Sequence, residues 1–359
     1  MLEEKKYEFL EELLSTPSPV GHEAEGQKIW LKETEAVADR IETDAYGSAA
    51  AFLDINPEAP TIMLEAHCDE IGMVVQHIDD SGFVYVSRLG GSDPAIARAR
   101  RVNIHTRTGQ VTGVIGHTAI HLQEKNGTNK APAWKDLFVD LGVSNKEEAL
   151  KLVQVGDPVT YVDQHEMIND DRLIGRALDN RIGGFIIAEA LRVLAERRSS
   201  LQVNVAVLNS VQEEVGGFGA RMMSYRLHPD AAIITDVTHA TDSPGINQKE
   251  HGTVKLGEGP VVTHGAAAHP ILTRKVEDIA GQKSIAIQHE AAGARTGTDT
   301  DSIFHQKTGI PCALISLPLR YMHSPVEMAS ITDVQNVIEL MAESVMACTL
   351  DENFNVLNR

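Results

Sequence analysis

The spacing of apolar residues divides the chain into two kinds of structure. Residues 3–14 and 24–40 carry apolar positions at helical intervals, and the stretch 40–54 predicts a hairpin around a turn. From about residue 74 the pattern changes to short alternating strands separated by Gly and Asp, which is typical of a small all-β domain. Longer apolar runs return near residue 165, which indicates that the β-rich part is inserted into another domain.

Apolar strands alternate with helices on either side of this insertion. Strands are expected at 62–66, 203–209, 231–235 and 312–317, and helices at 181–196, from about 334 to 346 and, inside the insertion, at 146–154. Strands that alternate with helices favour a mostly parallel sheet with helices on both faces. The sequence therefore predicts an α/β domain made of residues 1–71 and 166–359, interrupted by a β-barrel-like domain over 72–165.

Composition and charge exclude several classes of partner. The 359 residues include 51 acids against 32 Lys and Arg, for a formal net charge of -19, which disfavours nucleic acid and anionic membranes. The N-terminus lacks the apolar core of a signal peptide and no run of about 18 apolar residues occurs, so a cytoplasmic protein is expected. Cys68, Cys312 and Cys348 are too few for a disulfide framework or a cysteine-rich zinc site, so any metal is expected to bind to His and carboxylates.

Two adjacent acids, Glu213 and Glu214, follow the apolar strand 203–209. Neighbouring side chains on a strand point in opposite directions, so both can face one site only if the backbone turns, and the glycines just beyond them permit a turn. Two buried acids repel each other unless a cation keeps one ionised while the other moves a proton. We expect Glu214 to bind metal and Glu213 to act as a base; two solvated acids on a surface loop are the alternative.

Other ligand-type residues lie where strands are expected to end. His67, Asp236 and His323 each follow an apolar run. Asp179 precedes the helix 181–196, where it or Asn180 is also the expected N-cap. In open α/β sheets, ligands bind beyond the carboxyl ends of the strands. With Glu214, these residues are the ligand set of two closely spaced divalent ions that share a bridging carboxylate. Asp69, two residues after His67, is expected to fix the free ring nitrogen of that histidine.

Seven segments occur in an order that resembles one enzyme family. They are AHCDEIG, GRALDNRIGG, QEEVGGFGA, TDVTHATDSPG, GEGPVV, GTDTDS and RYMHSPVE, spread from about residue 67 to 327. Together they are similar to the signature segments of the tetrahedral, or TET, aminopeptidases, the family-forty-two metallopeptidases that include glutamyl and leucyl aminopeptidases. The resemblance implies the dinuclear zinc exopeptidase type of α/β fold, two Zn²⁺ or Co²⁺ ions per subunit, and a homododecamer built from dimers through the inserted domain.

The resemblance also implies a role for each candidate residue. His67 and Asp236 would bind one metal and Glu214 and His323 the other, with Asp179 as the bridge, and Glu213 would be the general base beside Asp69. Asn180 stands where many relatives have a second aspartate, which removes a charge but no ligand. Other residues carry weaker expectations. Cys68 is expected to be a packing residue, and His121 could reach a neighbouring subunit's site. Arg295 and Arg320 are expected to be structural residues or partners of an acidic substrate. The remaining histidines are expected at the surface or in the core: His251, His264, His269, His289 and His305.

The implied reaction is hydrolysis of the first peptide bond of short peptides, by a water activated between two divalent ions. Neither the native metal nor the preferred N-terminal residue is marked by a motif. Three alternatives stay open: a dinuclear amidase or deacylase acting on acyl amino acids, a glycan hydrolase that uses Glu213 and Glu214, and a shell-forming scaffold without catalysis.

Overall fold

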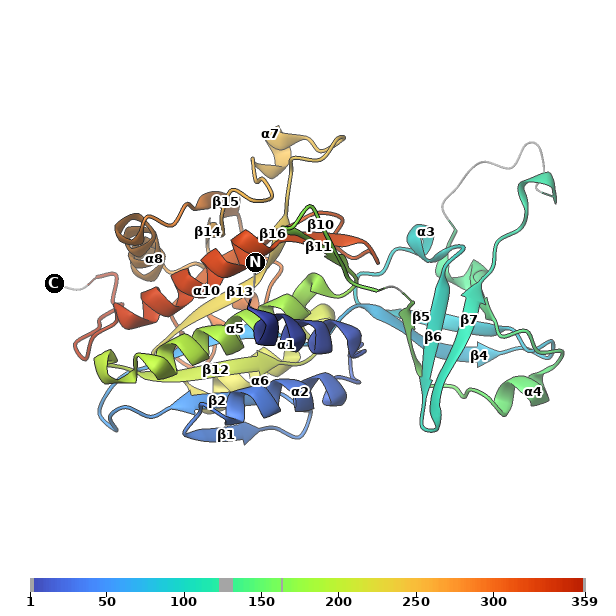
Figure 1. The fold of residues 1–359 in the computed structure, drawn as a ribbon, viewed down its shortest axis with the longest axis horizontal. Helices are drawn as coiled ribbons and strands as arrows, with labels where there is room; N and C mark the ends of the chain where they lie inside the picture. The colour runs from blue at the N-terminus through green and yellow to red at the C-terminus, as the bar shows by residue number, and fades with distance from the viewer. Residues whose placement is uncertain (1–2, 123–131, 163, 358–359) are drawn as a thin grey trace.

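A computed structural model describes residues 3–122, 132–162 and 164–357. The chain forms two lobes that lie side by side (Figure 1). One lobe is a sheet with helices packed on it, and the other is a β-barrel built from the middle of the sequence. None of the helices in the described part of the chain combines the length and apolar content needed to span a bilayer.

The larger lobe is built on an eight-stranded sheet with the order β1-β2-β12-β3-β13-β16-β14-β15. The strands are β1 (Arg40–Thr43), β2 (Ala49–Leu53), β3 (Thr61–His67), β12 (Asn204–Ser210), β13 (Ala231–His239), β14 (Val261–Gly265), β15 (Gln288–Ala292) and β16 (Cys312–Leu319). The central run β12-β3-β13-β16 is parallel, as is the pair β14-β15, and the other pairs are antiparallel. The predicted mostly parallel sheet is therefore confirmed.

Helices cover both faces of this sheet, as predicted. Five pack on one face, α1 (Glu4–Ser15), α2 (Ala24–Glu35), α5 (Leu178–Glu196), α8 (Pro270–Lys283) and α10 (Ile331–Met346), and two on the other, α6 (Phe218–Leu227) and α9 (Thr300–Ile303). Strand β12 shows why both faces need a cover: Val205 and Val207 belong to the first apolar cluster, and Ala206 and Leu208 to the second. Successive strand residues face opposite sides, so an uninterrupted apolar strand must be buried on both.

The smaller lobe is a closed barrel with the order β4-β5-β8-β7-β6-β9. Its strands are β4 (Gly72–Ile78), β5 (Val84–Leu89), β6 (Arg101–Thr106), β7 (Gly109–Ile115), β8 (Phe138–Asp140) and β9 (Pro158–Tyr161), with the short helices α3 (Pro94–Ala97) and α4 (Lys146–Leu150). Inward-facing residues such as Met73, Val84 and Ile104 fill a core separate from the cores of the sheet. The predicted β-rich insertion is thus confirmed, and closure leaves no open strand edge. A small sheet of β10 (Glu166–Ile168), β11 (Arg172–Gly175) and β17 (Glu327–Ser330) follows it.

Some predicted boundaries were wrong. The helix expected at 24–40 ends at Glu35, because the backbone N–H of Asp39 donates to Phe52 O and joins the β1–β2 hairpin. The helix expected at 146–154 ends at Leu150. The strand expected at 231–235 continues to His239, since β16 pairs along its whole length while β3 pairs only as far as Ile234.

Candidate metal centre

Two groups of ligand-type side chains share the carboxylate of Asp179. In the first group, His67 Nε2 lies 3.3 Å from Asp179 Oδ1 and 3.6 Å from Asp236 Oδ1. In the second, His323 Nε2 lies 3.2 Å from Asp179 Oδ2 and 3.4 Å from Glu214 Oε1. Each oxygen of Asp179 therefore faces a different histidine, which is the arrangement of a carboxylate that bridges two cations.

Parallel strands bring these residues to one edge of the sheet. His67 is the last residue of β3, Glu214 follows β12, and His323 follows β16. Asp236 was expected at a strand exit but lies inside β13, beyond the point where its pairing with β3 ends. The carboxyl ends of neighbouring parallel strands meet at the same edge, so residues far apart in sequence converge there.

Asp69 holds both His67 and the turn that carries the two glutamates. Its carboxylate accepts the backbone N–H of Glu213 at 3.0 Å and that of Glu214 at 3.2 Å. His67 Nδ1 hydrogen-bonds with the backbone carbonyl of Asp69 at 3.2 Å, and Asp69 Oδ1 lies 3.4 Å from the same nitrogen, on the side of the ring opposite Asp179. The turn itself requires a left-handed backbone at Gly217, where φ is 66°, a conformation open to glycine at little cost. One buried residue, through its carbonyl and its carboxylate, therefore orients a histidine and both glutamates.

Asn180 performs the capping role that the sequence left open for Asp179. Asn180 Oδ1 accepts the backbone N–H of Gly183 at 3.0 Å, and Asn180 Nδ2 donates to Thr235 O at 3.1 Å. Asp179 has φ −82° and ψ 104°, outside the helical region. Its carboxylate faces His67 and His323 instead of the helix end.

Glu327 is a site residue that the sequence reasoning did not single out. Its two oxygens accept the backbone N–H groups of His323, at 2.8 Å, and of Asp179, at 3.1 Å. Burial, together with the charge of Asp179, raises the pKa of the Glu327 carboxyl well above its usual value. Its place at the end of the segment RYMHSPVE, four residues after His323, was a signal in the sequence, but spacing alone does not show that its side chain reaches back to two ligands.

The site holds more buried negative charge than its histidines offset. Burial raises the pKa of Glu213 to about 10 and that of Glu214 to about 6. Burial opposes protonation of His323, but Asp179 and Glu214 outweigh it and raise its pKa to about 11. Glu214 Oε1 is buried and accepts no hydrogen bond from the described residues, although His323 Nε2 lies 3.4 Å away. Clustered carboxylates and imidazoles with an unsatisfied oxygen fit divalent cations.

A cavity of about 910 Å³ opens onto these residues. Glu213 lines it, and among the described residues nothing donates a hydrogen bond to its carboxylate. Arg295 also lines the cavity and is exposed. Arg320 instead donates two hydrogen bonds to Asp242, at 2.8 and 2.6 Å, which is a structural role.

Two further candidates lie outside the ligand groups. Burial raises the pKa of the Cys68 thiol well above its usual value, and Cys68 is only 2 % exposed, as expected of a packing residue. His121 lies in a short 3₁₀ turn, Ile120–Leu122, after the barrel strand β7. None of the ligand groups found among the described residues contains either of them.

Comparison with known proteins finds one family over most of the chain. A family profile described as M42 glutamyl aminopeptidase matches residues 47–340. A lysyl aminopeptidase from Pyrococcus furiosus is 32% identical over 337 residues, which are 93% of this chain and 95% of the relative. A TET aminopeptidase structure from the archaeon Thaumarchaeota archaeon SCGC AB-539-E09 has a TM-score of 0.91 at 31% identity, covering 96% of this chain and 97% of the other. The TET1 peptidase of Pyrococcus horikoshii, described as assembling into a tetrahedron or a large octahedral shell, has a TM-score of 0.85 at 30% identity, covering 96% and 100%.

Proposed function

Since this chain belongs to the M42 glutamyl aminopeptidase family, we propose that it is a metal-dependent aminopeptidase that uses two divalent ions to remove N-terminal residues from short peptides. The observation that carries the two-ion part of the proposal is the Asp179 carboxylate, whose two oxygens face His67 and His323. One shared carboxylate between two ligand groups is hard to explain for a site that holds a single ion.

The distances between the side chains divide the proposed ligands between two ions. His67 and Asp236 would hold one ion, Glu214 and His323 the other, and Asp179 would hold both. Imidazole and carboxylate donors suit Zn²⁺ or Co²⁺. Such a pair of ions supplies Lewis-acid polarisation of the scissile carbonyl and lowers the pKa of a nearby water to about 7.

Glu213 is the residue we assign to proton transfer. It lines the cavity beside the ligands, and its carboxylate makes no hydrogen bond within the described structure. With a pKa of about 10 the Glu213 carboxyl is protonated at pH 7, so it acts as a base only where bound cations hold it ionised. It would then take the proton of the attacking water and return it to the leaving amine. Asp69 is a positioning residue, since it fixes the backbone of Glu213 and the ring of His67.

Which N-terminal residue is preferred is a separate question. The family description names a glutamyl activity, whereas one similar protein is named a lysyl aminopeptidase, and these substrates have opposite charges. Arg295 is the cationic group that lines the cavity and is not engaged in any ion pair among the described residues. A panel of acidic, neutral and basic substrates is therefore needed.

The alternative reactions are distinguished by geometry and substrate. A glycosidase needs two free carboxyl groups on either side of the bond, but Glu214 already lies in a ligand group with His323. An amidase or deacylase would share all the ligands and differ only in accepting a blocked amine. A scaffold without catalysis would have no need for Glu213 beside a complete ligand set.

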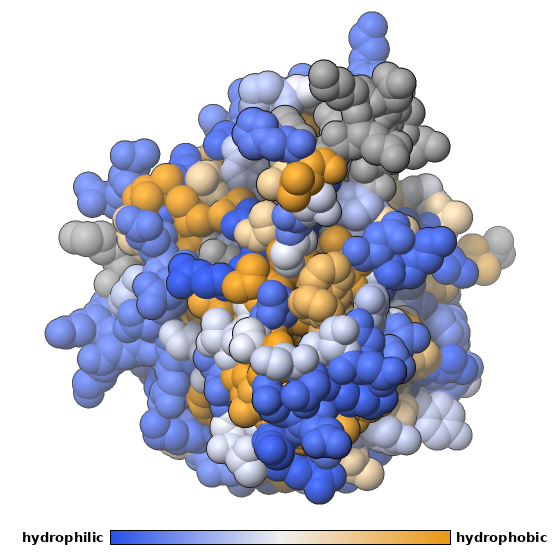
Figure 2. Space-filling view, turned by 90° about the vertical axis from the view of Figure 1, so that its right-hand side faces the viewer, coloured by the Kyte–Doolittle hydropathy of each residue, from blue (hydrophilic) through white to orange (hydrophobic). Residues whose placement is uncertain are grey.

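We also propose that the barrel over 72–165 mediates assembly into a dodecamer built from dimers. The similar TET1 peptidase is described as forming closed shells. Figure 2 shows the barrel end of the molecule as mostly hydrophilic with separate apolar patches. Exposed apolar side chains of the barrel are Val114, Leu122, Leu150, Leu152 and Val155. Light scattering of the purified protein tests this, and a monomer at micromolar concentration would contradict it.

Hydrolysis of aminoacyl anilides tests the proposed reaction. Glutamyl, leucyl and lysyl anilides, with N-acetylated versions as controls, are assayed before chelation, after chelation, and after Zn²⁺ or Co²⁺ is restored. The proposal expects cleavage of free-amine substrates that chelator abolishes and metal restores. Cleavage that survives chelation would remove the metals from the mechanism, and preference for acetylated substrates would favour the deacylase alternative.

A further inference from the structure

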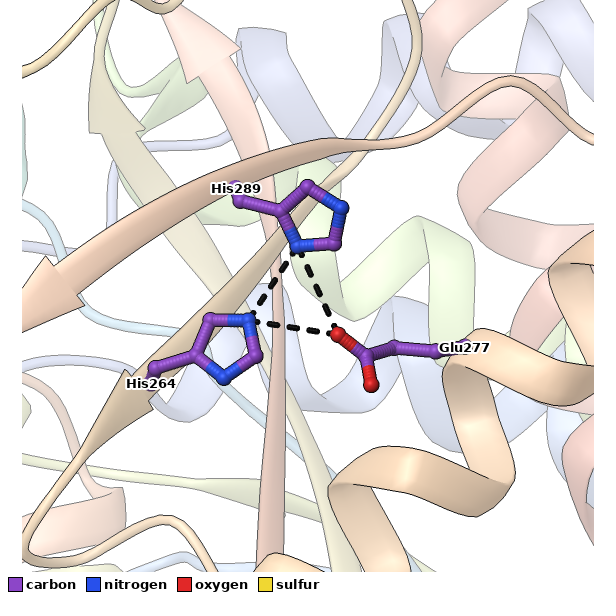
Figure 3. Close-up of side chains that lie close together, drawn as sticks. All are labelled: His264, Glu277 and His289. Atoms are coloured by element: carbon purple, nitrogen blue, oxygen red, sulfur yellow. Dashed lines mark hydrogen bonds and ion pairs between the residues drawn. The ribbon is translucent and has the colours of Figure 1, made fainter.

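A third group of ligand-type side chains lies away from the cavity, at the last two strands of the sheet. Figure 3 shows His264 from β14, His289 from β15 and Glu277 from α8 with their polar atoms pointing toward one another. His264 Nε2 lies 3.1 Å from His289 Nδ1, and Glu277 Oε1 lies 3.3 Å from His264 Nε2 and 3.5 Å from His289 Nδ1. The three atoms form a nearly equilateral triangle.

The register between β14 and β15 places the two histidines on the same face of the sheet. In the parallel pair β14–β15, Val262 is opposite His289 and His264 is opposite Ala291. His264 and His289 are therefore diagonal neighbours on the same face of the sheet. The opposite face is occupied by Thr263, whose hydroxyl donates to Glu290 at 2.5 Å.

Helix α8 covers the histidine face and supplies the third group. Val276 and Ala280 are buried against the sheet, so Glu277, beside them on the helix, is at the flank of the buried surface. From there its carboxylate reaches both rings. Two strands and a helix thus converge at this point, although the three residues share no recognisable ligand spacing in the sequence.

The distances match those of a tetrahedral metal site. With bonds of about 2.0–2.1 Å to nitrogen and oxygen, the ligand atoms of a tetrahedral Zn²⁺ lie about 3.3 Å apart. The three separations of 3.1, 3.3 and 3.5 Å bracket that value. The two rings contact each other, with a hydrogen bond in which one imidazole donates to the other, and both face the Glu277 carboxylate.

We propose that His264, Glu277 and His289 bind one divalent transition-metal ion, best matched by Zn²⁺, separate from the pair at Asp179. The side chains of His264 and His289 are 46% and 53% exposed, so a fourth coordination position faces solvent and suits water. The ion ties β14 and β15 to α8. Strand β15 leads directly into residues 294–298, which line the cavity, so the ion stabilises the support of one cavity wall.

Metal content and thermal stability test the proposal in the intact protein. Wild type, His289→Ala and Glu277→Gln are equilibrated over a range of free Zn²⁺, and bound zinc per subunit and the apparent melting temperature are measured. Each variant is expected to bind one zinc fewer per subunit and to lose part of the stabilisation by zinc, because binding to the folded state alone raises stability. His251→Ala is the matched control, since His251 is exposed beside a single acid, Glu250, at 3.9 Å, and should bind as wild type does.

Zinc bound at the third site can be measured separately from zinc bound at the proposed catalytic pair. The substitution Asp179→Ala should empty the proposed catalytic pair. If adding His289→Ala to that variant lowers the zinc content further, the zinc that is lost must belong to the third site. Equal zinc content and an equal melting response in wild type, His289→Ala and Glu277→Gln would overturn this proposal and leave the catalytic pair unaffected. Conversely, a wild-type protein that binds only the His289-dependent ion, with no ions at Asp179, would overturn only the proposed function.

Discussion

At the scale of single residues, the arrangement around Asp179 depends on groups outside the proposed ligand set. Asp69 accepts two backbone N–H groups of the glutamate turn, and Glu327 accepts the N–H groups of Asp179 and His323. Buried carboxylates that make such paired hydrogen bonds fix the backbone from which the ligands project. These hydrogen bonds therefore fix the backbone of Asp179, His323 and the glutamate turn.

Replacing Glu213 by Gln should separate proton transfer from metal binding. The amide has nearly the same shape but cannot accept the proton of water, so kcat should fall by about 10²–10⁴-fold. Both ions should remain bound, because Glu213 belongs to neither ligand group. Anilide hydrolysis and metal content are measured on the same sample, and wild-type turnover with full metal content would exclude Glu213 as the base.

Replacing Glu327 by Gln should weaken metal binding without removing a ligand. One of the two N–H groups loses its oxygen acceptor, because the amide nitrogen of Gln cannot accept a hydrogen bond, so His323 or Asp179 becomes less well fixed. Affinity for at least one ion should fall by about 10–100-fold, measured by competition with a chelator. Glu339→Gln, on the exposed side of α10, is the control and should leave affinity unchanged. Identical affinities in the two variants would mean that Glu327 does not position the ligands.

The sequence predicted the ligand types well but not all their surroundings. His67, Glu214 and His323 follow apolar strands, so their meeting at one edge of a parallel sheet could be anticipated. Glu327 could not, since its role depends on a side chain folding back across β17. His264 and His289 were expected at the surface or in the core; both are exposed, but their approach to Glu277 required the β14–β15 register.

At the scale of elements, the barrel reaches the metal centre through the segment that follows β5. A Cβ atom placed on Gly91 would lie 2.5 Å from His323 Nδ1, closer than real contacts allow. One placed on Gly90 would lie 3.0 Å from Glu214 Oε2. The inserted lobe therefore packs directly against two of the proposed ligands.

Substituting Gly91 by Ala should displace His323. Because the new methyl group occupies the space of the imidazole, we expect weaker metal binding and a fall in kcat/KM of roughly 10- to 100-fold. Gly116→Ala is a matched control, since a Cβ there would come no closer than 3.9 Å to Phe138. Kinetics at saturating metal and metal affinity are compared, and equal values for the two variants would show that His323 has room to move.

Helix α10 is tied to its neighbours by Glu343, and this contact should depend on pH. Burial favours the neutral acid, but Lys283 at 2.7 Å and Arg197 at 2.6 Å outweigh it and lower the pKa of Glu343. The folded state then binds fewer protons than the unfolded state, so the contribution is present above the unfolded pKa of about 4.5 and is lost as pH falls through the lower folded value.

Glu343→Gln should therefore lower the free energy of unfolding by ~0.5–1 kcal/mol at pH 7, with the small size reflecting the exposure of both cations. Thermal unfolding of the variant and wild type should differ at pH 7 and converge in acid. A difference that is the same at pH 7 and pH 3 would show that the ion pairs are not its source.

The sequence predicted which elements form better than where they end. The apolar run at 231–235 marked β13, but its continuation to His239 depends on pairing with β16, which lies much later in the chain. The helix expected at 24–40, α2, stops at Glu35 because β2 competes for the following backbone. Partners distant in sequence thus decided both boundaries.

At the scale of the whole molecule, folding concentrates charge at one edge of the sheet. The chain carries a net charge of -19, and Asp179, Glu213, Glu214 and Asp236 lie together at a single cavity, where His67 and His323 face them. Such a concentration of buried acids is unfavourable unless protons or cations offset it. The proposed pair of divalent ions would offset this concentration of buried charge.

Location of the ions by anomalous diffraction from zinc-loaded crystals tests the central claim most directly. We expect two peaks about 3.5–4 Å apart on either side of the Asp179 carboxylate, one beside His67 and Asp236 and the other beside Glu214 and His323. A single ion at this edge of the sheet, or two ions that do not share Asp179, would contradict the account.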